Sequence, residues 1–159
     1  LMPAQVLVVG LSVIGTGVLI SGAGEALGLA FMAPDNQSPT ERFGNLEGNL
    51  PLYLGWLAVL WLAGPAEELV FRSYLINRLT AIIGAGWTGS FVAVVVSALL
   101  FGLGHVYYQG LRGLVVTGAI GVTMGVLFLF YKRNVWPLMI GHAAVNSFVF
   151  TALYAGWDV

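Results

Sequence analysis

Cysteine is absent from this chain of 159 residues, and charged residues are scarce. Without cysteine the chain has no disulfide, no thiolate nucleophile and no cysteine ligand for zinc or an iron–sulfur cluster. Only 8% of the residues are charged, against about 25% in an ordinary soluble domain, so the chain cannot cover a water-facing surface. This excludes a single water-soluble globule, and the 58% hydrophobic content also excludes intrinsic disorder.

Basic residues are also few. The chain has six Lys plus Arg and a formal net charge of −1, so no basic patch is available to neutralise phosphates. We therefore do not expect nucleic acid as a partner. The composition instead predicts an integral membrane protein whose first partner is the lipid bilayer.

Five apolar segments are long enough to cross the hydrocarbon core, which takes roughly 17–25 helical residues. Backbone amides in lipid must be satisfied within the segment, so each segment is expected to be an α-helix. The expected fold class is therefore all-α, a polytopic transmembrane helical bundle, with residues 1–159 as a single membrane-embedded domain. The segments cover residues 4–33, 51–79, 89–108, 113–131 and 135–155.

The start of the sequence affects how many membrane-crossing segments are expected in the whole domain. The sequence starts Leu1-Met2-Pro3 rather than at an initiator methionine, so we expect the domain to be incomplete at its N-terminus. The first segment lacks a basic region before it and is longer than the apolar part of a signal peptide. We interpret it as a retained span, and the five segments as a lower bound.

Polar and glycine-rich stretches separate the segments. Residues 33–40, continuing to Glu47, form the only extended polar loop, and this loop is acidic. Glycine and polar residues predict shorter turns at residues 84–89, 107–110 and 132–134. Within the segments, Gly121 and Gly125 have the spacing of a close helix–helix contact, although glycine is common in membrane helices in any case.

The basic residues indicate an orientation. Arg78, Lys132 and Arg133 fall on one side of the five-segment arrangement, while the acidic loop and Asp158 fall on the other. The positive-inside rule places the basic side in the cytoplasm, in what we expect to be a prokaryotic cell membrane. Arg112 departs from this pattern.

Ionisable residues inside apolar segments are costly in hydrocarbon and are therefore candidates for function. Both histidines of the chain are among them. Glu25 lies late in the first segment, and we interpret it as a residue facing the lipid headgroups. The whole set is Glu25, Glu67, Glu68, Arg72, His105 and His142.

The two adjacent glutamates have different surroundings in the sequence. Glu68 and Arg72 are four residues apart, so they can pair on one helix face. Glu67 lies about 100° around the helix and has no such local partner. One carboxylate is thus held ionised, while the other is available as a general base for water. The alternative is that all three residues form a structural ion-pair cluster.

A second group of polar residues lies on two later segments. His142 and Asn146 are four residues apart and project together, and His105 follows Phe101 at the same spacing. A lone membrane histidine is more often an interhelical hydrogen-bond partner than a catalytic group. Two histidines, an asparagine and a glutamate pair on three helices instead predict a catalytic site.

These motifs resemble the signature of a known family. The order Glu67-Glu68-x-x-x-Arg72, Phe101-x-x-x-His105 and His142-x-x-x-Asn146 is similar to the three motifs of the CPBP intramembrane proteases. That family includes the CAAX prenyl endopeptidases and the bacteriocin-processing, Abi-type enzymes. The resemblance covers about residues 60–150 and implies an intramembrane endopeptidase.

The resemblance also implies a role for each motif residue. Glu67 would be the base that activates the hydrolytic water, assisted by His105. His142 and Asn146 would stabilise the oxyanion of the tetrahedral intermediate. The Glu68–Arg72 pair would hold the helix in place and adjust the basicity of Glu67. The resemblance also implies about eight spans, as family members commonly have, against the five segments found here, so further helices lining the substrate cavity are expected.

The substrate and cofactor stay open at this point. The substrate would be a peptide or a prenylated protein, with bacteriocin leaders and membrane signalling peptides equally open. Glu67, His105 and His142 could bind zinc and leave a position for water. A glutamate-activated water needs no metal, however, and we favour a metal-free resting site.

One geometric expectation conflicts with a shared site. At about 1.5 Å per residue, Glu67 lies about 16 Å from Arg78, whereas His105 lies about 25 Å from the turn at Thr88. His105 is then deeper by nearly two helical turns, unless the helices tilt or the second segment kinks at Pro65.

Two other functions would explain the buried charges. A proton- or ion-coupled transporter also uses buried Glu, Arg and His, but it would be expected to show an inverted repeat and paired broken helices, and the sequence shows neither. A non-catalytic bacteriocin-immunity or interaction protein would keep the fold without the reaction.

Overall fold

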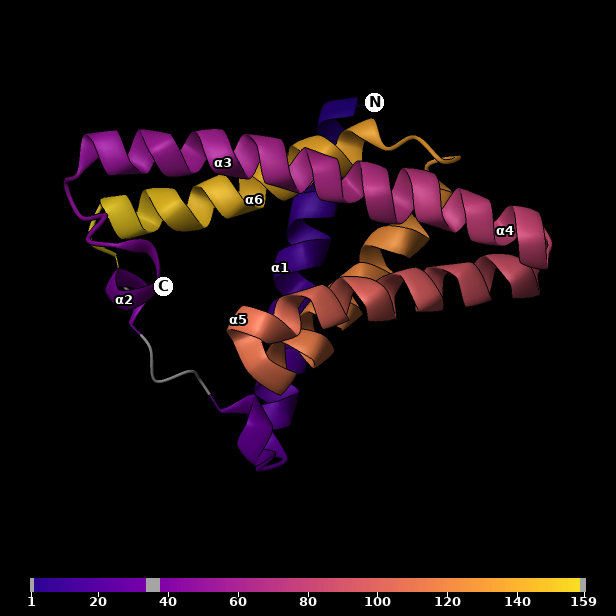
Figure 1. The fold of residues 1–159 in the computed structure, drawn as a ribbon, viewed down its shortest axis with the longest axis horizontal. Helices are drawn as coiled ribbons and strands as arrows, with labels where there is room; N and C mark the ends of the chain where they lie inside the picture. Colours follow the sequence, from indigo (N-terminus) through magenta and orange to yellow (C-terminus); the bar gives the residue numbers. More distant parts are fainter. Residues whose placement is uncertain (1, 34–37, 158–159) are drawn as a thin grey trace.

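The computed structural model describes residues 2–33 and 38–157, and all of its regular structure is helical (Figure 1). The predicted all-α fold class is therefore confirmed. Residues 34–37 of the predicted acidic loop, and Asp158, lie outside the described residues. The elements are α1 (Met2–Ala26), the 3₁₀-helix η1 (Ala30–Met32), α2 (Pro39–Phe43), α3 (Leu50–Glu68), the π-helix η2 (Leu69–Ile76), α4 (Asn77–Ile83), α5 (Trp87–Phe130) and α6 (Trp136–Tyr154).

Within the described chain, four helices are long and apolar enough to cross a membrane: α1, the continuous α3–η2–α4 from Leu50 to Ile83, α5 and α6. Much of their outer surface is apolar. Leu62 and Ile82, for example, are 74% and 81% exposed. A water-soluble protein rarely shows apolar surface on this scale, whereas lipid-facing helices require it. The chain is an integral membrane protein.

Helix α5 contains two of the five expected segments. It has 44 residues but reverses direction at Gly110, where φ is 60° and ψ is −157°. Almost only glycine adopts this combination, because a Cβ would clash with the backbone. Figure 1 shows the second half of α5 turning back beside the first. The turn expected at residues 107–110 is thereby confirmed, and the fourth expected segment, residues 113–131, corresponds to the second half of α5.

The two halves of α5 pack at distances that need glycine. A Cβ on Gly102 would lie 2.6 Å from the carbonyl oxygen of Leu114, and one on Gly121 would lie 3.0 Å from the Cα of Ala98. A Cβ on Gly125 would meet a side chain at 2.8 Å. The close contact predicted at Gly121 and Gly125 is confirmed, and it holds the hairpin of α5 together.

We expect Gly102→Ala to destabilise the protein, since the backbone of the other half of α5 must move to admit the methyl group. The expected loss is about 1–3 kcal/mol of unfolding free energy. Gly104→Ala is the matched control, because a Cβ there has nothing within 4 Å. Thermal unfolding in detergent micelles measures both, and equal unfolding temperatures for the two variants would contradict this packing.

The helix from Leu50 to Ile83 does not end at Gly64–Pro65, where the sequence allowed a break. The α-helical pattern instead widens to a π-helix at Leu69–Ile76, directly after the two glutamates. The carbonyl of Phe71, in this stretch, accepts a hydrogen bond from Ser97 Oγ of α5 at 2.7 Å. Such π segments inside α-helices are frequent at functional sites.

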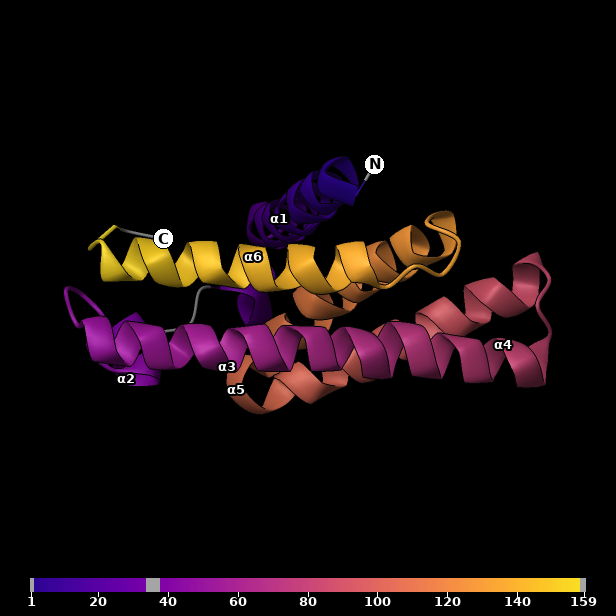
Figure 2. The same ribbon diagram turned by 90° about the horizontal axis from the view of Figure 1, so that it is seen from above.

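The long helices pack around a shared apolar core. α3 and α6 lie side by side in both views, and α1 crosses α5 and α6 steeply (Figures 1 and 2). Val9 of α1, Ile76 of η2, Met124 and Phe128 of α5, and Leu138 of α6 are nearly fully buried and form one apolar cluster. The cluster thus packs α1, η2, α5 and α6 together.

The basic residues divide between the two ends of the bundle. Arg133, in the turn before α6, donates hydrogen bonds to the side chains of Asn77 and Thr80, so this turn lies at the same end as α4. Arg112, which departed from the predicted charge pattern, forms an ion pair with Glu25 at 3.6 Å. Its positive charge is therefore partly offset by the residue that we had expected to face the headgroups.

Candidate active site

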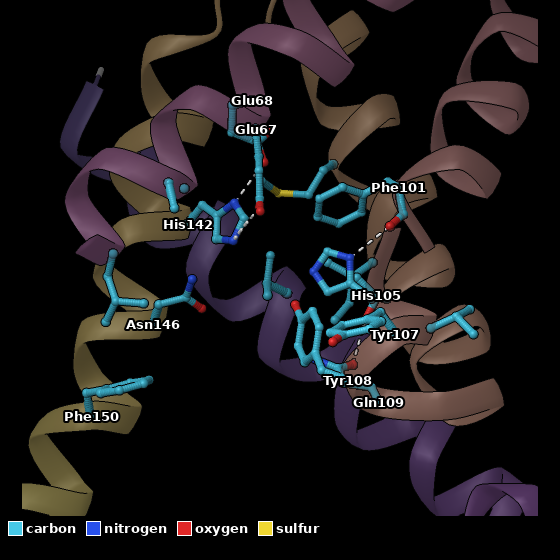
Figure 3. A pocket seen from close by; sticks show the side chains of 18 of the residues that line it. Glu67, Glu68, Phe101, His105, Tyr107, Tyr108, Gln109, His142, Asn146 and Phe150 are labelled. Carbon is cyan, nitrogen blue, oxygen red and sulfur yellow. Dashed lines mark hydrogen bonds and ion pairs between the residues drawn. The ribbon is translucent and has the colours of Figure 1, made fainter. Parts of the chain in front are cut away.

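A cavity of about 1090 Å³ lies between α3, α5 and α6 (Figure 3). Its volume slightly exceeds the range of about 300–1,000 Å³ that is usual for small-molecule sites, so a stretch of peptide fits. The three sequence motifs, which come from three different helices, meet at its walls. The predicted site residues that line it are Glu67, Glu68, Arg72, His105, His142 and Asn146.

The predicted difference in depth between Glu67 and His105 was wrong, because the second segment extends further than expected. The helix continues past residue 79 to Ile83, and α5 begins at Trp87. Measured from these ends at about 1.5 Å per residue, Glu67 lies about 24 Å and His105 about 27 Å from their shared turn. The two residues therefore lie at similar depths, and both line the same cavity.

Glu68 is the centre of a buried network. Its Oε1 accepts hydrogen bonds from Arg72 Nη1 at 3.0 Å and from His142 Nδ1 at 2.8 Å. Glu68 and Arg72 are 0% and 1% exposed, and the Arg72 guanidinium lies 4.2 Å from the centroid of the Phe101 ring. The predicted Glu68–Arg72 pair is confirmed. The bond from Glu68 to His142 was not predicted, and it joins the first motif to the third.

Both histidine rings are oriented through Nδ1. Since carbonyl and carboxylate oxygens only accept, His142 Nδ1 donates to Glu68, and His105 Nδ1 donates to the carbonyl of Phe101 at 2.8 Å. Each ring then turns its Nε2 toward the cavity (Figure 3). In the neutral ring this Nε2 accepts a hydrogen bond, and in the doubly protonated ring it donates one.

Glu67 stands apart from the buried network. Its side chain is 35% exposed, and its Oε2 lies 3.8 Å from His142 Nε2. This separation is too long for a hydrogen bond but short enough for one water molecule to contact both atoms. Asn146 follows His142 by one turn of α6 and faces the same space (Figure 3). His105 lies on the opposite wall, on α5.

Several cavity residues had no motif to identify them. Tyr108 packs against His105 with ring centroids 5.4 Å apart. Phe43, Trp56 and Phe150 line the far end of the cavity. The position of Tyr108, three residues after His105, is the one sequence signal that could have identified it. No sequence signal was available for Phe43, Trp56 and Phe150, which come from separate elements.

The zinc alternative requires Glu67, His105 and His142 to converge on one point. Among the residues that the structure describes, no group of three His, Asp or Glu side chains is close enough to hold a metal ion. As placed in this structure, the three residues do not fit a three-ligand zinc site.

Comparison with known proteins identifies a family. The family model described as "Type II CAAX prenyl endopeptidase Rce1-like" matches residues 49–148, which is more than half of the chain. None of the curated proteins and none of the solved structures compared with the chain matches it. The matched range contains every residue of the three motifs.

Proposed function

Because the chain belongs to the family of Rce1-like type II CAAX prenyl endopeptidases, we propose that it is an intramembrane endopeptidase in which Glu67 activates the hydrolytic water. The observation that carries this proposal is the meeting of three motifs, from three apolar helices, at one cavity. The family's description names an endopeptidase, which favours a protease over the transporter alternative.

The first step is the attack of water on the scissile carbonyl. Glu67 takes a proton from the water, and the resulting hydroxide forms a C–O bond with the carbonyl carbon. The 3.8 Å gap between Glu67 and His142 gives this water a place beside the carboxylate. His105, through its Nε2, accepts the second hydrogen bond of the same water and orients it.

The second step is stabilisation of the oxyanion. Asn146 donates from its amide, and His142 donates from Nε2 in its doubly protonated form. Glu68 holds the other ring nitrogen of His142 and is itself held by Arg72. Glu68 and Arg72 therefore act as positioning residues, since their buried side chains reach the substrate only through His142.

The third step releases the products. The C–N bond breaks, and Glu67 returns its proton to the departing amine, so that the reaction yields one carboxylic acid and one amine per water consumed. The substrates in view are peptides within or beside the membrane, including prenylated proteins, and a prokaryotic cell membrane is the proposed location. A non-catalytic immunity or interaction protein would hold the same residues without this turnover.

Asn146→Ala is expected to lower kcat about 10²–10³-fold with little change in KM, because an oxyanion donor acts mainly in the transition state. The matched control is Ser147→Ala, one residue further on, whose hydroxyl accepts a hydrogen bond from Trp61 Nε1 rather than lining the cavity. Steady-state cleavage of a quenched fluorescent peptide in proteoliposomes measures both. A normal kcat for Asn146→Ala would remove Asn146 from the mechanism.

A further inference from the structure

The α5 wall of the cavity carries a polar residue that the mechanism does not use. Gln109 follows His105 by four residues, so the two side chains share one face of α5. Both residues line the cavity, and Gln109 lies beyond His105 on the same wall (Figure 3). At about 1.5 Å per residue, the two are about 6 Å apart along the helix axis. Gln109 therefore borders the space that a peptide would fill next to the catalytic residues.

The side chain of Gln109 is held in one orientation by the second half of α5. Its Oε1 accepts a hydrogen bond from Thr117 Oγ1 at 3.1 Å, across the reversal at Gly110. Thr117 is itself buried. Gly113 makes room for this arrangement, since a Cβ there would overlap the Cβ of Gln109. The carboxamide of Gln109 is thus fixed through its oxygen.

The amide nitrogen of Gln109 is available to a ligand. A carboxamide has an acceptor oxygen and an NH₂ group with two donors. Thr117 binds the oxygen, and no residue in the described part of the chain accepts a hydrogen bond from Nε2. In a bound peptide the acceptors that every residue offers are the main-chain carbonyl oxygens. A fixed amide donor in a peptide-sized cavity therefore matches the main chain of a substrate.

From these contacts we infer that Gln109 is a substrate-binding residue, whose Nε2 donates a hydrogen bond to a main-chain carbonyl of the peptide. An extended peptide advances about 3.3 Å per residue, so 6 Å corresponds to about two residues. The carbonyl therefore belongs to a residue about two positions from the scissile bond. The inference rests on the proposed function, since it takes the scissile bond to lie beside Glu67 and His105.

The competing explanation is that the bond between Gln109 and Thr117 only fastens the two halves of α5. Two variants separate the explanations, because both remove this bond. Gln109→Met also removes the amide donor, whereas Thr117→Val leaves the donor in the cavity. Gln5→Met is the matched control, since it makes the same substitution on α1, at a residue that does not line the cavity.

We expect Gln109→Met to raise KM about three- to tenfold with little change in kcat, as the loss of one hydrogen bond to the bound substrate does. Thr117→Val should raise KM by less than about twofold, because the donor remains. Gln5→Met should change neither constant. Steady-state cleavage of the quenched fluorescent peptide by the full chain in proteoliposomes measures all three. Equal rises in KM for Gln109→Met and Thr117→Val would overturn the inference in favour of the fastening role.

A thioamide scan identifies the carbonyl itself. Sulfur replaces oxygen in one main-chain carbonyl at a time, on both sides of the cleaved bond but not at that bond, and each peptide competes with its oxygen parent in the same vesicles. Because sulfur is the weaker acceptor, the wild type should cleave one thioamide, about two positions from the cleaved bond, about threefold more slowly than its parent. Gln109→Met should cleave the two peptides equally. This ratio of rates does not depend on how much of the enzyme is folded.

Each outcome has a defined meaning. A slowed thioamide whose effect disappears in Gln109→Met and persists in Thr117→Val identifies the carbonyl that binds Gln109. The absence of such a position, or an effect that Gln109→Met retains, overturns the inference. Failure of the wild type to cleave any peptide contradicts the proposed function instead, so the two failures are distinguishable.

Discussion

Glu67→Gln is expected to lower the rate of peptide cleavage by at least about 10³-fold, within the range of 10²–10⁴ for a general base. Glutamine keeps the size of the side chain but cannot take a proton from water. Glu67 is 35% exposed and lies outside the buried Glu68–Arg72 network, so the fold should survive the change. Initial rates in proteoliposomes and unfolding temperatures in detergent measure the two effects separately.

The matched control for this variant is Glu25→Gln. Glu25 is also a glutamate in an apolar segment, but it pairs with Arg112 and does not line the cavity. Its replacement should leave the cleavage rate unchanged. If Glu67→Gln kept more than a tenth of the wild-type rate, Glu67 would not be the base. The alternative, a structural ion-pair cluster of Glu67, Glu68 and Arg72, would then be favoured.

Arg72→Met is expected to cause the largest loss of stability, about 3–5 kcal/mol. The reason is that Glu68 is 0% exposed and would lose its arginine partner while remaining buried. The cation–π contact with Phe101 would be lost as well. Unfolding temperature in detergent micelles is the measurement.

Two further variants test this reason. Arg78→Met removes an exposed arginine from the following helix α4 and should change stability by no more than about 0.5 kcal/mol. The double variant Glu68→Gln/Arg72→Met removes both charges, so it should be more stable than Arg72→Met alone. A double variant less stable than Arg72→Met would show that the uncompensated charge of Glu68 is not the cause.

Local features of the site were predictable from the sequence because helix geometry fixes them. Residues four apart on a helix face each other, which gave the Glu68–Arg72 pair and the shared direction of His142 and Asn146. The scarcity of charge predicted the membrane-spanning, all-α fold. Gly110 predicted the turn at residues 107–110, where the chain reverses and the two halves of α5 come together.

Long-range features could not be predicted in the same way. The bond between Glu68 and His142 joins residues 74 apart in the chain, and no local spacing encodes it. The position of His105 opposite Glu67 depends on where α4 ends, and the polar Arg78 suggested an end that was too early. The far end of the cavity is lined by Phe43, Trp56 and Phe150, which come from three elements, so it forms only when α2, α3 and α6 pack together.

Hydrolysis by the isolated protein is the most direct test of the central claim. The wild-type chain in proteoliposomes is incubated with a peptide that ends in a C-a-a-X motif, with its cysteine farnesylated or unmodified, and the products are weighed by mass spectrometry. The account predicts two fragments whose masses sum to the substrate plus one water, and their loss in Glu67→Gln. Intact peptides of both kinds beside a correctly folded protein, or fragments that Glu67→Gln produces equally well, would contradict it.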